Sequence, residues 1–320
     1  MKTVKTLEKL GYNPHSIGIT MKELVIRAIN LIRQRRFNFE MSGKVAYDGK
    51  GEDVYSNTDT EAQIIYLKGI LENFPKFGVI AEEDRLVENC QIPGHDIYFT
   101  IDPLCGTKAF GSRQSYGIAT MFALVVNGEV AAAYIGDVIA REVYGYRPGS
   151  NKVWRIWRTG DYDRTIELEI NTEITLAEQW SQFTEDMHKY SELAQSTVSG
   201  SYYDGVFRRH FSPLVSGSNV MSGSIGLHYA RLWNGEVGLL VLPAHMNTPW
   251  DTTPVIGISE KLGFVHVYLS ESGHVLKDKK IELVKELKPG EHEILVFHKS
   301  RIDEFVAWHK KAFSKAKELD

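Results

Sequence analysis

Two short apolar stretches, Gly78–Asp84 (GVIAEED) and Thr100–Phe110 (TIDPLCGTKAF), decide how the rest of this chain is interpreted. Each has the composition of a short buried strand that ends in acidic residues. The second stretch breaks at once into Pro103 and then Gly106-Thr107, because proline cannot continue a strand ladder and glycine favours a turn. Both stretches therefore deliver carboxylates to strand ends, where rigid sites are built.

The second stretch offers groups for a cation and an anion together. Asp102 ends the apolar strand, and its carboxylate is a hard ligand of the kind that suits Mg²⁺, an ion usually held by a few carboxylates plus phosphate oxygens. Gly106 and Thr107 add free backbone N–H groups and a hydroxyl at a predicted helix start, where phosphate is favoured. A strand followed by a polar turn is the alternative for an isolated Asp-Pro pair, and it loses ground when the other acidic segments are considered.

Three segments carry a resemblance to a known family. Glu82-Glu83, residues 102–107 (DPLCGT) and Trp250-Asp251 resemble, in order and spacing, the signature motifs of the inositol monophosphatase-like family of Mg²⁺-dependent, lithium-sensitive phosphatases. The resemblance spans roughly residues 53–264. It implies two or three Mg²⁺ ions and a set of metal ligands: Glu82, Asp102, the carbonyl of Leu104, Cys105 and Asp251.

Cys105 departs from the family pattern, which has a metal-ligating aspartate at this place. A thiol is a poor ligand for Mg²⁺, whereas a thiolate prefers softer ions such as Zn²⁺. Four interpretations follow: a weakened second metal site with low turnover, a shift of metal preference toward Mn²⁺ or Zn²⁺, recovery of the missing oxygen from a water or a neighbouring carboxylate, or a small buried residue that fills a turn.

Asp59 closes the segment Ser56–Asp59, just before the helical pattern Glu61–Leu71. By itself this position predicts a helix cap. The segment is also similar to the family's Thr-x-x-Asp element, with Ser56 in the threonine position. The resemblance implies that Asp59 orients Thr107, and that Thr107 and Glu82 hold and deprotonate the attacking water, as a base held by a second group does.

The substrate contacts are predicted from small residues. Gly223 and Ser224 precede the helical stretch Ile225–Trp233, and the resemblance implies that they lie beside the alcohol part of the substrate, with Gly106 and Thr107 on its phosphate. The surrounding segment, residues 197–224, is rich in Ser and Gly and is equally typical of a substrate-contacting segment and of a connecting loop.

The substrate class rests on two further observations. The run GTKAF at residues 106–110 is more similar to the bisphosphate nucleotidase branch of the family than to the inositol monophosphatase branch. Pro243–His245 occupies the place of a glutamate with which inositol-type enzymes grip a sugar hydroxyl. Inositol, sugar and nucleotide phosphates therefore all stay open as substrates.

The fold class is predicted as α+β. Residues 19–36 have helical spacing, residues 178–193 are weakly helical, and Asn127-Gly128 between two apolar runs predicts a hairpin. The resemblance implies a layered α/β/α/β/α sandwich of two intimately packed subdomains. Residues 1–145 would carry most metal ligands, and residues 146–320 would contribute Asp251 and substrate contacts.

Composition and net charge limit the classes of molecule that the chain is expected to bind. The 320 residues are 43% hydrophobic and 24% charged with a net charge of −4, so the chain can bury a large core and has no general attraction for a nucleic-acid polymer or an anionic membrane. Two cysteines are too few for a disulfide framework, and no segment has signal-peptide character, so a cytoplasmic location is the default. The family's tendency suggests a homodimer. The chain is thus expected to be either a phosphomonoesterase for a small phosphorylated substrate or a catalytically silent relative that binds such a ligand or serves as a subunit.

Overall fold

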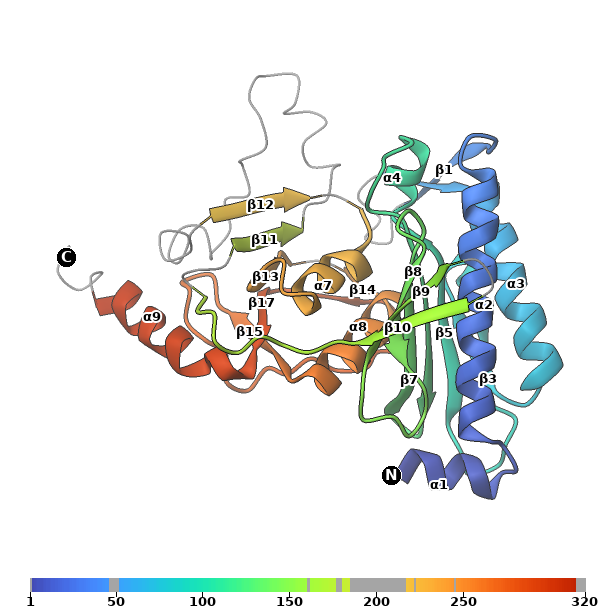
Figure 1. Cartoon of the computed structure of the whole chain (residues 1–320). Coiled ribbons are helices and arrows are strands. Elements are labelled where there is room, and N and C mark those ends of the chain that lie inside the picture. Colours follow the sequence, from blue (N-terminus) through green and yellow to red (C-terminus); the bar gives the residue numbers. More distant parts are fainter. Residues whose placement is uncertain are drawn as a thin grey trace.

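The computed structural model describes residues 2–45, 52–159, 162–176, 180–184, 217–221, 223–244 and 246–314 (Figure 1). Most of the segment 197–224, predicted to contact substrate or to connect elements, lies outside the described residues. Within them, none of the helices combines the length and the apolar character needed to cross a lipid bilayer.

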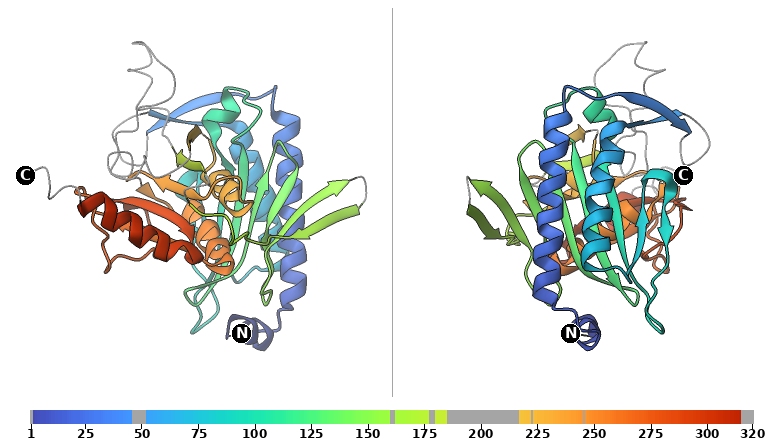
Figure 2. Two further views of the ribbon diagram at one scale, coloured as in Figure 1. Left: turned by 60° about the vertical axis from the view of Figure 1, so that its left-hand side comes forward. Right: turned by 90° about the vertical axis from the view of Figure 1, so that its right-hand side faces the viewer.

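Two long helices form the first layer. Helix α2 (Pro14–Arg35) follows a short helix α1 (Lys2–Lys9), and its N-cap Asn13 accepts hydrogen bonds from the backbone N–H groups of His15 and Ser16. Helix α3 (Asn57–Asn73) begins after the hairpin of β1 (Met41–Val45) and β2 (Glu52–Ser56). Figure 2 shows α2 and α3 side by side over one face of a large sheet.

The large sheet has eight strands. In spatial order they are β10 (Tyr162–Glu167), β9 (Trp154–Thr159), β8 (Glu142–Tyr146), β7 (Glu129–Asp137), β6 (Ala119–Val126), β5 (Ile97–Cys105), β3 (Gly78–Ala81) and β4 (Val87–Glu88). β3 and β5 are parallel and the other neighbours are antiparallel, with the predicted hairpin at Asn127-Gly128. Every residue of β5 is buried, so this strand lies at the centre of the molecule.

A second sheet of five strands follows in the C-terminal half. Its spatial order is β12 (Gly217–Met221), β11 (Trp180–Thr184), β13 (Leu239–Leu242), β17 (Glu293–His298) and β15 (Phe264–Leu269). The prediction of helix across residues 178–193 was wrong at residues 180–184. β-Favouring residues in WSQFT pair there in parallel with both β12 and β13, and this pairing overrides weak helical spacing.

The remaining helices complete five layers. Helices α7 (Ile225–Trp233) and α8 (Pro249–Leu262) lie between the two sheets, and α9 (Ile302–Ser314) covers the outer face of the second sheet (Figure 1). Separate apolar clusters fill the spaces between these layers. The predicted mixed α/β sandwich is therefore confirmed. The first sheet continues past residue 145 to β10, and the division into two subdomains at that residue stays a prediction.

Short elements complete the chain: α4 (Thr107–Gly111), the 3₁₀ helices η1 (Glu83–Arg85) and η3 (Lys299–Arg301), and a small sheet of β14 (Met246–Asn247) with β16 (Lys288–Pro289). Both η1 and α4 directly follow strands of the first sheet. The predicted acidic strand ends thus do pass into tight turns.

The buried His228 of α7 should make the unfolding free energy fall as the pH is lowered. Burial first, and Arg231 second, lower its pKa to about 3, so the fold holds the neutral ring. A lowered folded pKa means that the stabilising contribution is complete above the unfolded value of 6.5 and is lost as the pH falls toward 3. Between pH 6.5 and 5 the wild type should lose up to about 2 kcal/mol more unfolding free energy than His228→Gln.

Urea unfolding at several pH values measures this slope, with the exposed His15→Gln as control. The half-buried His266, whose pKa desolvation lowers to about 4, should retain part of the slope in the variant. Parallel pH profiles for wild type and His228→Gln would contradict the prediction.

Candidate active site

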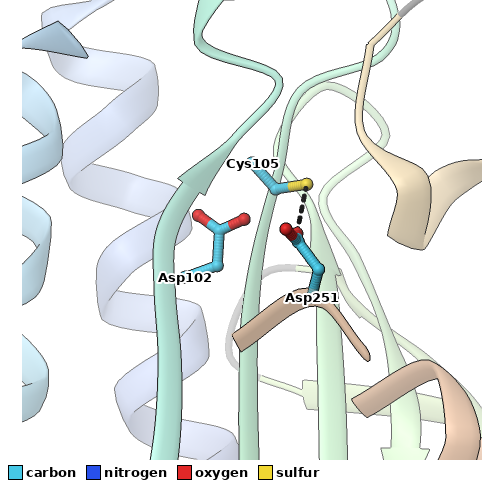
Figure 3. Close-up of side chains that lie close together, drawn as sticks. All are labelled: Asp102, Cys105 and Asp251. Atoms are coloured by element: carbon cyan, nitrogen blue, oxygen red, sulfur yellow. Dashed lines mark hydrogen bonds between the residues drawn. The ribbon is translucent and has the colours of Figure 1, made fainter. Parts of the chain in front are cut away.

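Three side chains from two distant segments meet at the end of β5. Asp102 and Cys105 come from β5 and Asp251 from the first turn of α8, and Figure 3 shows all three pointing into one space. One ligand atom from each lies within 4.8 Å of the others, and Cys105 Sγ is 3.7 Å from Asp251 Oδ1. Among the described residues, this is the one group of three or more His, Cys, Asp or Glu side chains close enough to share a metal ion.

A bulge in β5 places Asp102 and Cys105 on the same side. Asp102 pairs with Met121 and Cys105 with Ala119, so three steps along β5 match two steps along β6. Residues three apart in a regular strand point to opposite faces, and one extra residue reverses that parity. The sequence DPLC therefore brings two candidate metal ligands together, because its proline interrupts the ladder.

Asp251 is held by its own helix start. Its place before a helical pattern is also typical of a cap, but the N-cap of α8 is Thr248, because Pro249 fixes the first helical residue. The Thr248 hydroxyl donates to Asp251 Oδ2 at 2.5 Å. Oδ1, on the Cys105 side, is thereby aimed into the shared space.

The electrostatics of the cluster favour a cation. Asp102 is 2% exposed, and its Oδ1 has no hydrogen-bond partner. Burial raises the pKa of Asp102 well above its ordinary value, and the charges of Glu82 and Asp251 raise it further. Burial likewise raises the pKa of the Cys105 thiol, with Asp102 and Asp251 adding to the effect. A bound cation would reverse these costs.

A second group connects Asp59 with Thr107. The Thr107 hydroxyl is 3.0 Å from Asp59 Oδ1 and 3.0 Å from the carbonyl oxygen of Leu104, both of which can accept its hydrogen bond. The other Asp59 oxygen accepts from the Ser56 N–H at 2.9 Å and from the Ser56 hydroxyl at 2.5 Å. Asp59 thus completes a capping box with Ser56 and also holds Thr107. Burial, its largest perturbation, raises the pKa of Asp59 to about 6.

Glu82 lies near enough to Asp102 to raise the pKa of that carboxyl, but it is hydrogen-bonded to Lys44, which is not a member of the cluster. Lys44 of β1 donates to Glu82 Oε1 at 3.0 Å and lies 3.7 Å from Glu83 Oε1. Burial and the Glu82 charge raise the pKa of Glu83 to about 8, although Lys44 acts to lower it. These residues line a hollow of about 470 Å³ with Tyr55, Thr60 and Arg85. The structure therefore brings Asp102 together with Cys105 and Asp251, and Asp59 together with Thr107. Glu82 is instead hydrogen-bonded to Lys44.

Two residues of this region escaped sequence analysis. Lys44 lies opposite Asp53 in the β1–β2 hairpin, but no motif marks it. Gln63 of α3 donates to the Glu83 carbonyl at 3.1 Å and accepts from the Glu83 N–H at 3.0 Å, so it fixes the turn after Glu82. The available signal for Gln63 was its place on the same side of α3 as Asp59, four residues earlier.

The predicted substrate-binding residues converge on Gly117. Gly106 has φ +88°, and a Cβ there would lie 2.1 Å from the Gly117 carbonyl oxygen and 2.9 Å from the Ser224 nitrogen. Gly223 has φ +111° and a similarly close approach to Gly117, whose carbonyl accepts a 2.9 Å hydrogen bond from the Ser224 N–H. Gly106 therefore lies beside Gly223 and Ser224, although more than a hundred residues of chain separate it from them.

Gly106→Ala is expected to lower the unfolding free energy by about 2 to 4 kcal/mol, since strained φ and a backbone clash add. Gly128→Ala is the matched control, because Gly128 has φ +82° but nothing within 4 Å of the point that a Cβ would occupy. Its loss should be about 1 to 2 kcal/mol. Equal losses at the two positions, measured by urea unfolding, would show that the approach to Gly117 carries no cost.

The sequence is similar to a family of known proteins. The sequence model of the inositol monophosphatase family matches residues 14–300. The Nus factor SuhB of Xylella fastidiosa is 32% identical over 101 residues, which are 32% of this chain and 34% of the relative. The Nus factor SuhB of Vibrio cholerae is 28% identical over 114 residues, 35% of this chain and 41% of the relative. The chain thus matches well under half the length of these curated relatives.

Solved structures match over most of the chain. The suhB protein of Bartonella henselae has a TM-score of 0.66 at 17% identity and covers 93% of this chain and 100% of its own. A Thermotoga maritima IMPase has a TM-score of 0.64 at 18% identity, with 92% and 96% covered. An IMPase/NADP phosphatase complexed with Mg²⁺ and phosphate has a TM-score of 0.62 at 16% identity, with 92% and 95% covered. At these identities the likeness establishes the fold.

Proposed function

Since the chain belongs to the inositol monophosphatase family, we propose that it is a metal-dependent phosphomonoesterase that hydrolyses a small phosphorylated alcohol, sugar or nucleotide. One observation carries the proposal: Asp59 holds the Thr107 hydroxyl close in the chain to Cys105, which forms with Asp102 and Asp251 a cluster that could hold a cation. A protein with a purely structural role has no use for both arrangements at one strand end.

Metal ligation is assigned by chemistry. Asp102 and Asp251 offer hard oxygens that fit Mg²⁺, the ion of this family, and Glu82 and the Leu104 carbonyl would add two more. The Cys105 thiol does not fit Mg²⁺. When bound, two or three such ions would polarise the phosphate ester and lower the pKa of a water.

The protein side chains prepare the attacking water. Thr107 would hold the water through its hydroxyl oxygen while donating its own hydrogen to Asp59 Oδ1. Glu82 would take a proton from the water as the water oxygen bonds to phosphorus in line with the P–O bond to the alcohol. That P–O bond would break, and the leaving alkoxide would take up a proton from solvent. Gly106 would leave backbone N–H groups open to the phosphate, and Gly223 with Ser224 would border the alcohol.

A member of the family without turnover is the second candidate. Cys105 favours it, because a thiol replaces a hard oxygen donor in the cluster. Such a protein would bind a phosphorylated ligand or act as a subunit, and relatives named Nus factor SuhB make the subunit role worth testing.

Phosphate release tests the proposal. The full chain is assayed with Mg²⁺, Mn²⁺ and Zn²⁺ in turn on inositol, sugar and nucleotide monophosphates and bisphosphates, and the best substrate names the class. Asp59→Asn should lower release by roughly 10²- to 10⁴-fold. Asp96→Asn is the control, since Asp96 forms an exposed ion pair with Lys285. Binding of these compounds without release in any metal would favour the second candidate.

A further inference from the structure

The donor set of the Asp102 cluster differs from that of an ordinary magnesium site. Two carboxylates and one thiol converge there, and all three side chains point into the same space (Figure 3). Mg²⁺ demands oxygen ligands, while a thiolate with carboxylates is bound well by Zn²⁺ and by Co²⁺, its spectroscopic substitute. The thiol is therefore informative about which ion the cluster holds.

The spacing agrees with a shared ion. Zinc–sulfur and zinc–oxygen distances of about 2.3 and 2.1 Å at a tetrahedral angle place the two ligand atoms about 3.6 Å apart. Cys105 Sγ and Asp251 Oδ1 are 3.7 Å apart. The thiol hydrogen bond to Asp251 in the metal-free protein thus has the spacing of two ligand atoms of one ion.

A second observation concerns the Asp102 carboxylate of the same cluster. Asp102 is only 2% exposed, and its Oδ1 has no hydrogen-bond partner. A buried carboxylate oxygen without a donor is costly, and a metal ion satisfies it. Asp251 Oδ2 is already used by Thr248, which leaves Oδ1 for the cluster.

We infer that Asp102, Cys105 and Asp251 form a mixed sulfur–oxygen centre that binds Zn²⁺ or another thiophilic divalent cation in preference to Mg²⁺. Three protein ligands leave one tetrahedral position open, as in catalytic zinc sites. The inference deepens the proposed metal centre and rests on it, but it does not depend on turnover. Glu82 does not belong to this group of three. Its carboxylate would serve a separate hard ion such as Mg²⁺ next to the mixed centre.

Cobalt binding tests the inference directly. The metal-free full chain is titrated with Co²⁺, and a near-ultraviolet thiolate-to-cobalt charge-transfer band is expected at one equivalent. Cys105→Ser should lose the band while keeping a small hydroxyl at the same place. Cys90→Ser is the matched control, because Cys90 is the only other cysteine of the chain and should leave the band unchanged.

Competition against a chromogenic chelator gives the affinities. Cys105→Ser should weaken Zn²⁺ binding by at least about 100-fold, since the loss of an outer partner alone costs roughly 10- to 100-fold. Mg²⁺ should fail to displace Zn²⁺ at equal concentration. Circular dichroism spectra and melting curves establish that the variants are folded.

The possible results distinguish failure of the mixed sulfur–oxygen centre from failure of the proposed phosphatase function. Co²⁺ binding without the band, or a band that persists in Cys105→Ser, would overturn the inference while leaving Mg²⁺-dependent phosphate release intact. The absence of any divalent-ion binding and of any phosphate release would overturn the proposed function as well. A band confined to chains that retain Cys105 supports the inference, whatever the activity.

Discussion

Replacing Asp102 with asparagine is expected to raise the stability of the metal-free protein and to abolish its phosphate release. The carboxylate is buried with an unpartnered oxygen beside Glu82 and Asp251, so removing its charge should raise the unfolding free energy by roughly 1 to 3 kcal/mol. The same change removes a carboxylate that the proposed function uses as a metal ligand. Phosphate release should then fall by about 10³-fold or more, because metal charge stabilisation is worth several kcal/mol.

The pH dependence of this gain has a definite sign. Burial raises the folded pKa of Asp102 above its ordinary 3.8, so its stabilising contribution is complete below pH 3.8 and is lost as the pH rises. Asparagine has no such dependence, and the advantage of the variant should grow from pH 4 toward pH 8. Asp59 and Glu83, with pKa values raised to about 6 and about 8, should keep part of the slope in the variant.

Melting curves in a chelating buffer at pH 5 and pH 8 measure the effect, and phosphate release is assayed in parallel. Asp137→Asn is the control, since Asp137 is a partly buried carboxylate whose oxygen accepts from the Ile139 and Ala140 N–H groups. Its removal should destabilise the protein. A lower melting temperature for Asp102→Asn at pH 8 would contradict the assignment of Asp102 as a strained metal ligand.

The layered fold could be predicted because its signals are local. The apolar runs on either side of Asn127-Gly128 pair as β6 and β7, with one register shift between Leu124 and Val125, and the helical spacing of residues 19–36 becomes most of α2. Strand β11 could not be predicted in this way. Its place depends on parallel pairing with β12 and β13, which lie far away along the chain.

The site likewise contains residues that sequence motifs predict and residues that no motif marks. The Asp59–Thr107 bond and the meeting of Asp102 with Asp251 follow from motifs, and the structure brings these residues together. Lys44 and Gly117 carry no motif. Their importance comes from what other segments bring to them: Glu82 to Lys44, and Gly106 with Gly223 to Gly117.

The Cys105→Asp exchange should convert the centre to one that prefers Mg²⁺. A third carboxylate completes an oxygen donor set with Asp102 and Asp251, so Mg²⁺-dependent phosphate release should rise by about tenfold or more, and the cobalt charge-transfer band should disappear. Cys105→Asn is the matched control, because it has the same size without the charge. A gain in Asp but not in Asn would assign the effect to ligation.

The same exchange should act on stability with the opposite sign to Asp102→Asn. It adds a carboxylate at a position that is 7% exposed, next to two others, so the metal-free variant should melt below the wild type, and increasingly so as the pH rises. Mg²⁺ should restore the loss, since an ion that binds only the folded state stabilises it by an amount that grows with the logarithm of its affinity. If Mg²⁺ neither stabilises the variant nor speeds phosphate release, Cys105 does not occupy a metal-ligand position, and its contact with Asp251 is a packing contact of the β5 bulge.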